Sequence, residues 1–149
     1  MNLVEEFVVT GVLAEPIPVG DGPIGTRVIY GITGGDIVGE RVNAKILGGG
    51  EWALIAADGF LRVDVRLQAE TDDGAFLYVQ YGGLLEMNEA VAAATSNGLG
   101  TEFGDQYFYT SLRIETGDER YAWMNTTFFV GEGRLLPDAR VQYKVSRPG

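Results

Sequence analysis

The sequence predicts an all-β fold over residues 1–149, in which one antiparallel sheet of about eight to ten strands closes into a barrel beside one short helix. Between Leu61 and Glu70, apolar side chains alternate with charged or amide side chains, the period of a strand with one apolar face. Similar two-faced segments recur, and no long helical pattern does. The 22 glycines and five prolines separate short runs rich in strand-forming residues. A closed sheet of this size can enclose a small molecule.

The strands follow one another with little other structure between them. The stretch Leu13–Thr26 is rich in proline and glycine and predicts a long loop at the mouth of the barrel. A short helix is expected over residues 88–95, where Asn88 can cap the amino end and Asn97-Gly98 can end the helix. Strands are expected near residues 5–14, 26–34, 38–46, 51–57, 60–71, 75–86, 106–116, 120–131 and 138–146.

The pair Asp58-Gly59 lies between two strand patterns and is typical of a two-residue type I′ hairpin. That loop length places Glu51 opposite Arg66 and puts Trp52 on the same face as the apolar side chains of the next strand. Because the strand period is two, the loop length decides which face each side chain joins.

The next hairpin surrounds Asp72–Gly74 and could hold two or three loop residues. A three-residue loop with Gly74 in the left-handed conformation matches the charged face of the preceding strand with Phe76, Tyr78 and Gln80. We favour this register because polar side chains then lie opposite polar side chains.

Composition excludes several classes of function. Without cysteine or histidine, the chain has no disulfides, common zinc sites or histidine-dependent nucleophiles, and acid–base work falls to Asp, Glu, Arg, Lys and Tyr. A net charge of −10 disfavours nucleic acid and anionic membranes. The sequence indicates no cofactor, no metal, no membrane span and no signal peptide, so a cytoplasmic location is expected, and a homo-oligomer remains open.

A second polar face follows the strand Tyr107–Glu115, where polar side chains alternate with apolar ones. A loop of odd length at residues 117–119 would bring Tyr121, Trp123 and Asn125 onto the same face. If this face points inward, it forms a wet cavity with an aromatic lining, the usual composition of a small-molecule pocket. If it points outward, it is a solvated wall around an apolar interior, which is the commoner arrangement of antiparallel sheets.

Several short motifs follow one another in a specific order along the chain. They are Gly48-Gly49-Gly50-Glu51-Trp52, Asp58-Gly59, Asp64-Val65-Arg66, Asp72-Asp73-Gly74, Glu115-Thr116-Gly117 and Tyr121-Ala122-Trp123-Met124-Asn125. With these motifs, the chain from the Gly34-Gly35 segment through Val145 resembles the bacterial and fungal family called domain of unknown function 3237, or UPF0311. The resemblance implies a calycin-like antiparallel barrel and says little about activity.

The leading functional hypothesis is a cofactor-free lyase or isomerase, a cyclase included, that acts on a small oxygenated cyclic or aromatic compound. Burying charged side chains inside a barrel costs several kcal/mol, which favours an inward face with a function. A non-catalytic barrel that carries or senses an apolar ligand is the alternative from another class. Epoxide opening by paired acid groups and a plain scaffold with a packed interior also fit the residue types.

The candidate residues follow from the two polar faces and are expected to share one interior space. Asp64 or Glu115 would act as general base, while Arg66 and Arg113 would stabilise an enolate or carboxylate. A tyrosine or an asparagine of the set would donate a hydrogen bond to a carbonyl. The substrate-binding set comprises Glu51, Trp52, Tyr78, Tyr109, Trp123 and Asn125.

Overall fold

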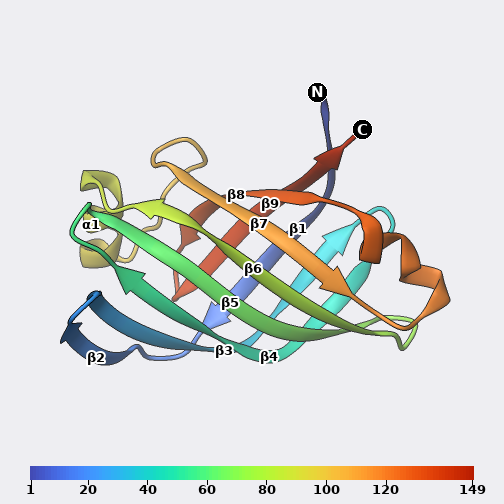
Figure 1. The fold of residues 1–149 in the computed structure, drawn as a ribbon, viewed down its shortest axis with the longest axis horizontal. Helices are drawn as coiled ribbons and strands as arrows, with labels where there is room; N and C mark the ends of the chain where they lie inside the picture. Colours follow the sequence, from blue (N-terminus) through green and yellow to red (C-terminus); the bar gives the residue numbers. More distant parts are fainter.

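The fold is a closed antiparallel barrel, described for residues 1–149 by a computed structural model (Figure 1). One nine-stranded sheet runs in the order β1-β9-β8-β7-β6-β5-β4-β3-β2, and an additional pairing of β1 with β3 closes it. The strands are β1 (Leu3–Leu13), β2 (Ile17–Gly22), β3 (Gly25–Gly39), β4 (Asn43–Ile55), β5 (Phe60–Thr71), β6 (Phe76–Glu86), β7 (Phe108–Glu115), β8 (Phe129–Leu136) and β9 (Arg140–Pro148).

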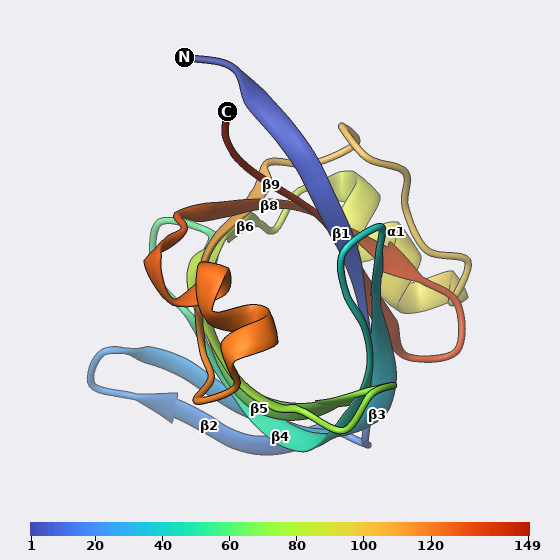
Figure 2. The ribbon, with the colours of Figure 1, turned by 90° about the vertical axis from the view of Figure 1, so that its right-hand side faces the viewer.

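Eight of these strands form the wall, because β2 pairs with β3 alone and lies outside the ring (Figure 2). The predicted all-β barrel is therefore confirmed. Strand β2 lies within the stretch Leu13–Thr26, where a loop was expected. Two prolines in and before this edge strand, Pro16 and Pro18, remove backbone donors, so the sequence offered no clear strand signal there.

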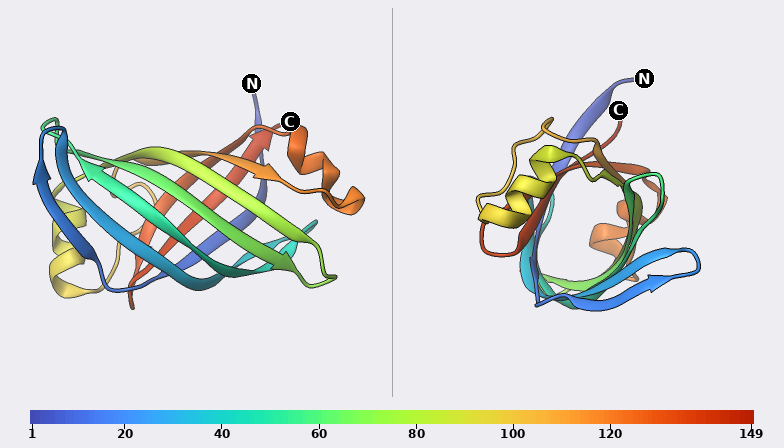
Figure 3. Two further views of the ribbon diagram at one scale, coloured as in Figure 1. Left: turned by 60° about the horizontal axis from the view of Figure 1, so that its bottom comes forward. Right: turned by 90° about the vertical axis from the view of Figure 1, so that its left-hand side faces the viewer.

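Two short helices lie at opposite ends of the barrel (Figures 1 and 3). The α-helix α1 (Glu89–Asn97) follows β6, and the Asn88 side chain accepts a hydrogen bond from the backbone N–H of Val91, as predicted. Gly98 ends this helix in the left-handed conformation, which glycine adopts without strain. The 3₁₀-helix η1 (Glu119–Thr126) follows β7.

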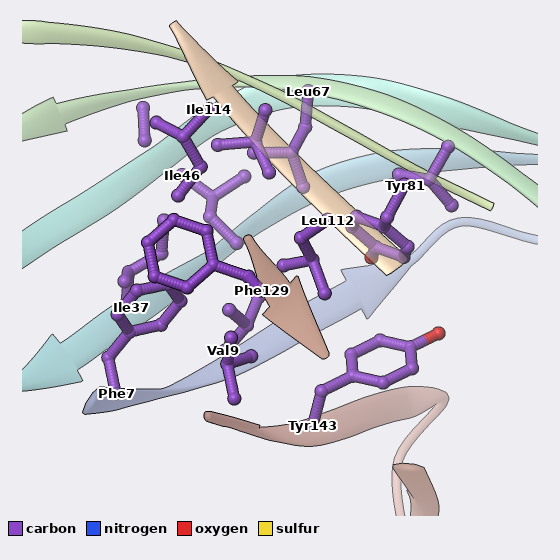
Figure 4. Close-up of a cluster of buried hydrophobic side chains, with 14 of the residues drawn as sticks. Phe7, Val9, Ile37, Ile46, Leu67, Tyr81, Leu112, Ile114, Phe129 and Tyr143 are labelled. Carbon is purple, nitrogen blue, oxygen red and sulfur yellow. The ribbon is translucent and has the colours of Figure 1, made fainter. Parts of the chain in front are cut away.

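The interior is apolar along most of its length. Side chains from every wall strand meet there, and 28 buried residues form one continuous cluster. Phe7 and Phe129, both labelled in Figure 4, pack with ring centroids 5.3 Å apart, and Phe129 also packs against Trp123 of η1. This packing fills one end of the barrel with aromatic side chains.

The loop at Asp58 is longer than expected, and this changes the register of the hairpin. Ile55 pairs with Leu61, and the Ala56 N–H donates a hydrogen bond to the Phe60 carbonyl, so the loop holds the three residues 57–59. Gly59 takes a φ of 82°. The Asp58 carboxylate accepts a hydrogen bond from the N–H of Phe60, which stabilises the three-residue turn. The pairing slips by one residue, so Glu51 lies opposite Val65 rather than Arg66. The side chains of Glu51–Ile55 therefore lie on the opposite face from the one predicted, whereas the part of β4 before the bulge between Ile46 and Gly48 has a different register.

The second hairpin has the predicted geometry. Gly74 has a φ of 92°, and Glu70, Gln68 and Arg66 pair with Phe76, Tyr78 and Gln80 respectively. Other strand boundaries differ from the predicted ones. The expected strand 26–34 is part of a longer β3 that ends at Gly39, the expected strand 38–46 crosses the turn between β3 and β4, and the expected strand 51–57 is the last part of one continuous β4.

The segment 120–131 is wrong as a strand, since its first part is η1. The Asp118 side chain caps this helix by accepting a hydrogen bond from the N–H of Arg120. Tyr121 and Met124, three residues apart, are both buried, which a helical turn permits and a strand does not. No helix is long and apolar enough to cross a membrane.

Candidate active site

The charged face of β5 lies on the outside of the barrel. Val63 and Val65 are 4% and 1% exposed and point into the interior, whereas Arg66 is exposed and Asp64 is partly exposed. The prediction that these charges line the interior is therefore wrong. The physical reason is the commoner arrangement of an antiparallel sheet, in which the apolar face covers the core and the charged face is solvated.

The polar face of β7 also points outward. Leu112 and Ile114 are buried, while Tyr109, Arg113 and Glu115 are exposed, and the Arg113 guanidinium donates a 2.8 Å hydrogen bond to Oε1 of Gln80 on the same outer face. The shared interior space expected for these residues does not exist, and a catalytic role for them stays a prediction that would need a site on the outer wall. Trp52 and Tyr78 are on that outer surface as well.

Trp123 and Asn125 belong to η1 and are not brought onto the β7 face. The Asn125 side chain accepts a hydrogen bond from the Thr116 N–H and donates one to the Thr116 carbonyl, so it fastens η1 to the end of β7. Trp123 packs beside Phe129, and the Arg41 guanidinium lies 3.6 Å from the centroid of its ring. Both side chains have structural contacts at the end of the barrel opposite α1.

Glu51 is the one predicted site residue that the structure places inside the barrel. It is 9% exposed and contributes to a cavity of about 130 Å³ next to α1. The cavity is predominantly apolar, and Met87 and Thr95, both exposed, lie on its solvent side. Its lining consists of Leu13, Tyr30, Glu51, Leu61, Val63, Leu85, Met87, Val91, Thr95, Phe108, Leu135, Val141 and Tyr143.

The environment of Glu51 makes its carboxyl group a weak acid. Two causes together raise its pKa to about 7: burial, which is the larger, and the negative charge of Asp64 on the outer face of the neighbouring strand. No ion pair or hydrogen bond with a protein group opposes this shift. Near neutral pH, both the protonated and the ionised forms are therefore populated, as proton transfer requires.

Three tyrosines surround this carboxyl group. Burial raises the pKa of Tyr30, Tyr81 and Tyr143, and the charge of Glu51 raises all three further. The rings of Tyr81 and Tyr143 meet edge to face, with centroids 5.1 Å apart. The phenols stay protonated at neutral pH, so Tyr30 and Tyr143, which line the cavity, can donate hydrogen bonds to a bound oxygen.

Helix α1 covers the cavity but makes few attachments to the wall. Before the helix, Met87 donates a backbone hydrogen bond to the Gly59 carbonyl, and after it Thr101 donates one to the Leu135 carbonyl. Between these points, the hydrogen bonds of residues 89–99 stay within the segment 88–99. Only Val91 and Ala94 of the helix are buried, so α1 is held over the cavity mainly by a small apolar contact.

A second buried glutamate, Glu6, lies at the opposite end of the barrel, and no sequence pattern predicted its burial. Arg41 contacts its carboxylate through Nη2 at 2.7 Å, and Arg147 donates to the same oxygen. The hydrogen bond from Arg41 lowers the pKa of Glu6, with Arg147 adding to the effect against the cost of burial. Glu6 is thus an ionised structural group, unlike Glu51.

No metal centre is assigned, because no group of three or more acidic side chains comes together in the structure. Glu51 could not be distinguished in the sequence, since both faces of residues 51–56 carry apolar side chains and only the loop length chooses between them. Tyr30, Tyr81 and Tyr143 looked like ordinary strand residues for the same reason.

The barrel fold agrees with comparisons to known proteins. A family model described as protein of unknown function (DUF3237) matches residues 2–147, nearly the whole chain. The chain belongs to this family. A UPF0311 protein of Clostridium acetobutylicum is 30% identical over 140 residues, which cover 93% of this chain and 89% of that protein.

Two further relatives extend the comparison. The crystal structure of a conserved protein of unknown function from Rhodopseudomonas palustris superposes with a TM-score of 0.89 at 26% identity, covering 98% of this chain and 96% of that one. The PR-toxin biosynthesis cluster protein 7 of Penicillium roqueforti is 27% identical over 145 residues, which cover 83% of this chain and 77% of the relative. One relative of the chain is therefore a fungal protein named for a toxin biosynthesis cluster.

Proposed function

We propose that the barrel is a cofactor-free acid–base enzyme, a lyase or isomerase, a cyclase included, that acts on a small oxygenated cyclic or aromatic compound. The observation that carries the proposal is Glu51, a buried carboxyl group with a pKa of about 7 inside an apolar cavity. Proton-transfer catalysts are most effective when their pKa lies near the working pH. Glu51 takes the place that the sequence suggested for Asp64 or Glu115.

The chemistry divides between Glu51 and its tyrosine neighbours. In its ionised form, Glu51 removes a proton from an acidic C–H or O–H group of the bound compound, and in its protonated form it returns a proton to another atom. The hydroxyls of Tyr30 and Tyr143 donate hydrogen bonds to the oxygen on which charge develops. The cavity lining, almost wholly apolar, excludes water from these steps.

The size of the cavity supports a compact substrate. A cavity of roughly 150 Å³ is known to hold a benzene-sized molecule, so about 130 Å³ accommodates a single ring with α1 in its present position. A larger substrate requires α1 to move away from the wall, which its few attachments permit. The fungal relative from a toxin biosynthesis cluster supports a role in the conversion of small molecules.

A non-catalytic carrier is the second candidate, and the apolar lining favours it as strongly as it favours an enzyme. The enzyme needs a carboxyl group that titrates near neutral pH, whereas the carrier does not. A carrier of apolar ligands gains nothing from an unpaired buried glutamate, which costs stability. This cost is the reason to place the enzyme first.

The direct test is proton exchange into small cyclic ketones. We expect the protein to accelerate deuterium incorporation from D₂O at the α-carbon of 2-cyclohexenone or cyclohexanone, followed by NMR, and Glu51→Gln to reduce the acceleration by at least about a hundredfold. Glu40→Gln removes the same charge from an exposed turn and serves as the matched control. Equal rates in wild type, Glu51→Gln and buffer, with binding intact, would instead support the carrier.

A further inference from the structure

The lining of the cavity has an uneven distribution of charge. Of its thirteen residues, Glu51 alone is ionisable as an acid near neutral pH, and no arginine or lysine is among them. The arginines that the sequence placed with the site, Arg66 and Arg113, are exposed on the outer wall. The cavity therefore carries a negative charge when Glu51 is ionised, and it has no cationic side chain that could balance the charge of an anionic ligand.

Glu6 shows what the same fold does when it needs an ionised buried carboxylate. That side chain has two arginine partners, Arg41 and Arg147, and a lowered pKa. Glu51 has no such partner. A buried ion without a counter-charge is costly, and a cation brought by a ligand would remove that cost.

The aromatic side chains around Glu51 suit a cation as well. Tyr30, Phe108 and Tyr143 line the cavity, and Tyr143 meets Phe108 and Tyr81 edge to face, with centroids 5.2 Å and 5.1 Å apart. Aromatic faces attract ammonium groups most strongly where water is excluded. A carboxylate among aromatic rings is therefore complementary to an organic ammonium ion.

We propose that the interior cavity is a binding site for small apolar amines, which bind in the protonated form with the ammonium group against the Glu51 carboxylate and the single hydrocarbon ring among the apolar side chains. The proposal shares Glu51 and the cavity with the proposed function but needs no turnover. It applies to a catalyst, in which such amines are competitive inhibitors, and equally to a carrier, in which they are cargo.

The test uses three probes of one shape and different charge: benzylamine, benzyl alcohol and benzoate. Titrations at pH 8 are followed by isothermal calorimetry and by amide chemical shifts of residues in the lining, which separate binding inside the cavity from loose attraction to an acidic surface. We expect benzylamine to bind at least about tenfold more tightly than benzyl alcohol, and benzoate to bind more weakly than either.

Glu51→Gln supplies the decisive variant, because it keeps the shape of the side chain and removes the charge. We expect it to abolish the preference for benzylamine over benzyl alcohol while leaving benzyl alcohol binding within a few-fold of wild type, which also shows that the variant is folded. Glu40→Gln, on an exposed turn, should keep the preference in full.

The preference also depends on pH. The groups that face Glu51 are Tyr30 from β3, Tyr81 from β6 and Tyr143 from β9, with Asp64 on β5 acting through the wall, and the three phenols stay protonated between pH 6 and 8. Glu51, with a pKa of about 7, becomes ionised over this interval. Benzylamine affinity should therefore rise roughly tenfold from pH 6 to pH 8, while benzyl alcohol affinity changes little.

Equal affinities for benzylamine and benzyl alcohol, failure of benzylamine to shift the lining residues, or a preference that survives Glu51→Gln would each overturn the proposal. The two proposals fail separately. If the protein prefers benzylamine but does not accelerate proton exchange into ketones, amine binding is supported and the proposed catalysis is contradicted. If it accelerates exchange but has no preference for benzylamine, the catalysis is supported and amine binding is contradicted.

Discussion

The two ends of the barrel each bury one glutamate, and the fold treats them in opposite ways. At the end closed by η1, Glu6 receives hydrogen bonds from Arg41 and Arg147, which lower its pKa. At the end covered by α1, Glu51 has no such partner, and burial raises its pKa to about 7. The contrast teaches that burial alone does not make a carboxyl group structural or reactive, because the presence or absence of a cationic partner decides between the two.

The largest expected effect comes from removing the unpaired charge. Glu51→Gln should stabilise the protein by roughly 3 kcal/mol at pH 8, since a pKa raised from 4.5 to about 7 makes ionisation in the folded state costly. The folded state binds the Glu51 proton more tightly, so the contribution of this group to stability is fully present below the ordinary carboxyl pKa and is lost as pH rises through 7. Urea melts at pH 4 and pH 8 measure this, and a gain of equal size at both values would contradict it.

Removing the paired charge should have the opposite sign. Glu6→Gln is expected to destabilise the protein by about 2 kcal/mol at pH 7, because charge-assisted hydrogen bonds to Arg41 and Arg147 are lost. The pKa of Glu6 is lowered, so its contribution is present above the ordinary carboxyl pKa and is lost as pH falls through the folded-state value. A urea melt in which this variant equals wild type at pH 7 would mean that the ion cluster carries no stability.

The smallest expected effect separates burial from the neighbouring charge at Glu51. Asp64→Asn should lower the pKa of Glu51 by only a part of its total shift, since burial is the larger cause and Asp64 the smaller. A carbon-detected NMR titration of the Glu51 carboxyl group measures both values. Return of the pKa to its ordinary range in this variant would show that the like charge, rather than the apolar surroundings, tunes the site.

The sequence was informative where structure is determined locally. Strand β5 has the predicted bounds, and the Asn88 cap and the left-handed Gly74 are both present, because each depends on a few neighbouring residues. Which face of the wall points inward was misjudged because charged side chains on an alternating strand look alike inside and outside. Glu51 points into the interior because the loop is one residue longer than the Asp58-Gly59 pair suggests, which shifts the pairing of β4 with β5 by one residue. Only the packing of the whole barrel decides between these two loop lengths.

The aromatic plug under η1 makes the barrel a tube with one blind end. Phe7, Trp123 and Phe129 fill that end, while exposed Met87 and Thr95 mark the other. A molecule that enters the cavity beside α1 must leave through the same opening, so entry and release share a single passage. For the proposed reaction, a single passage suits the conversion of one molecule into one other, because no second fragment has to leave first, and release of the product past α1 would then limit turnover.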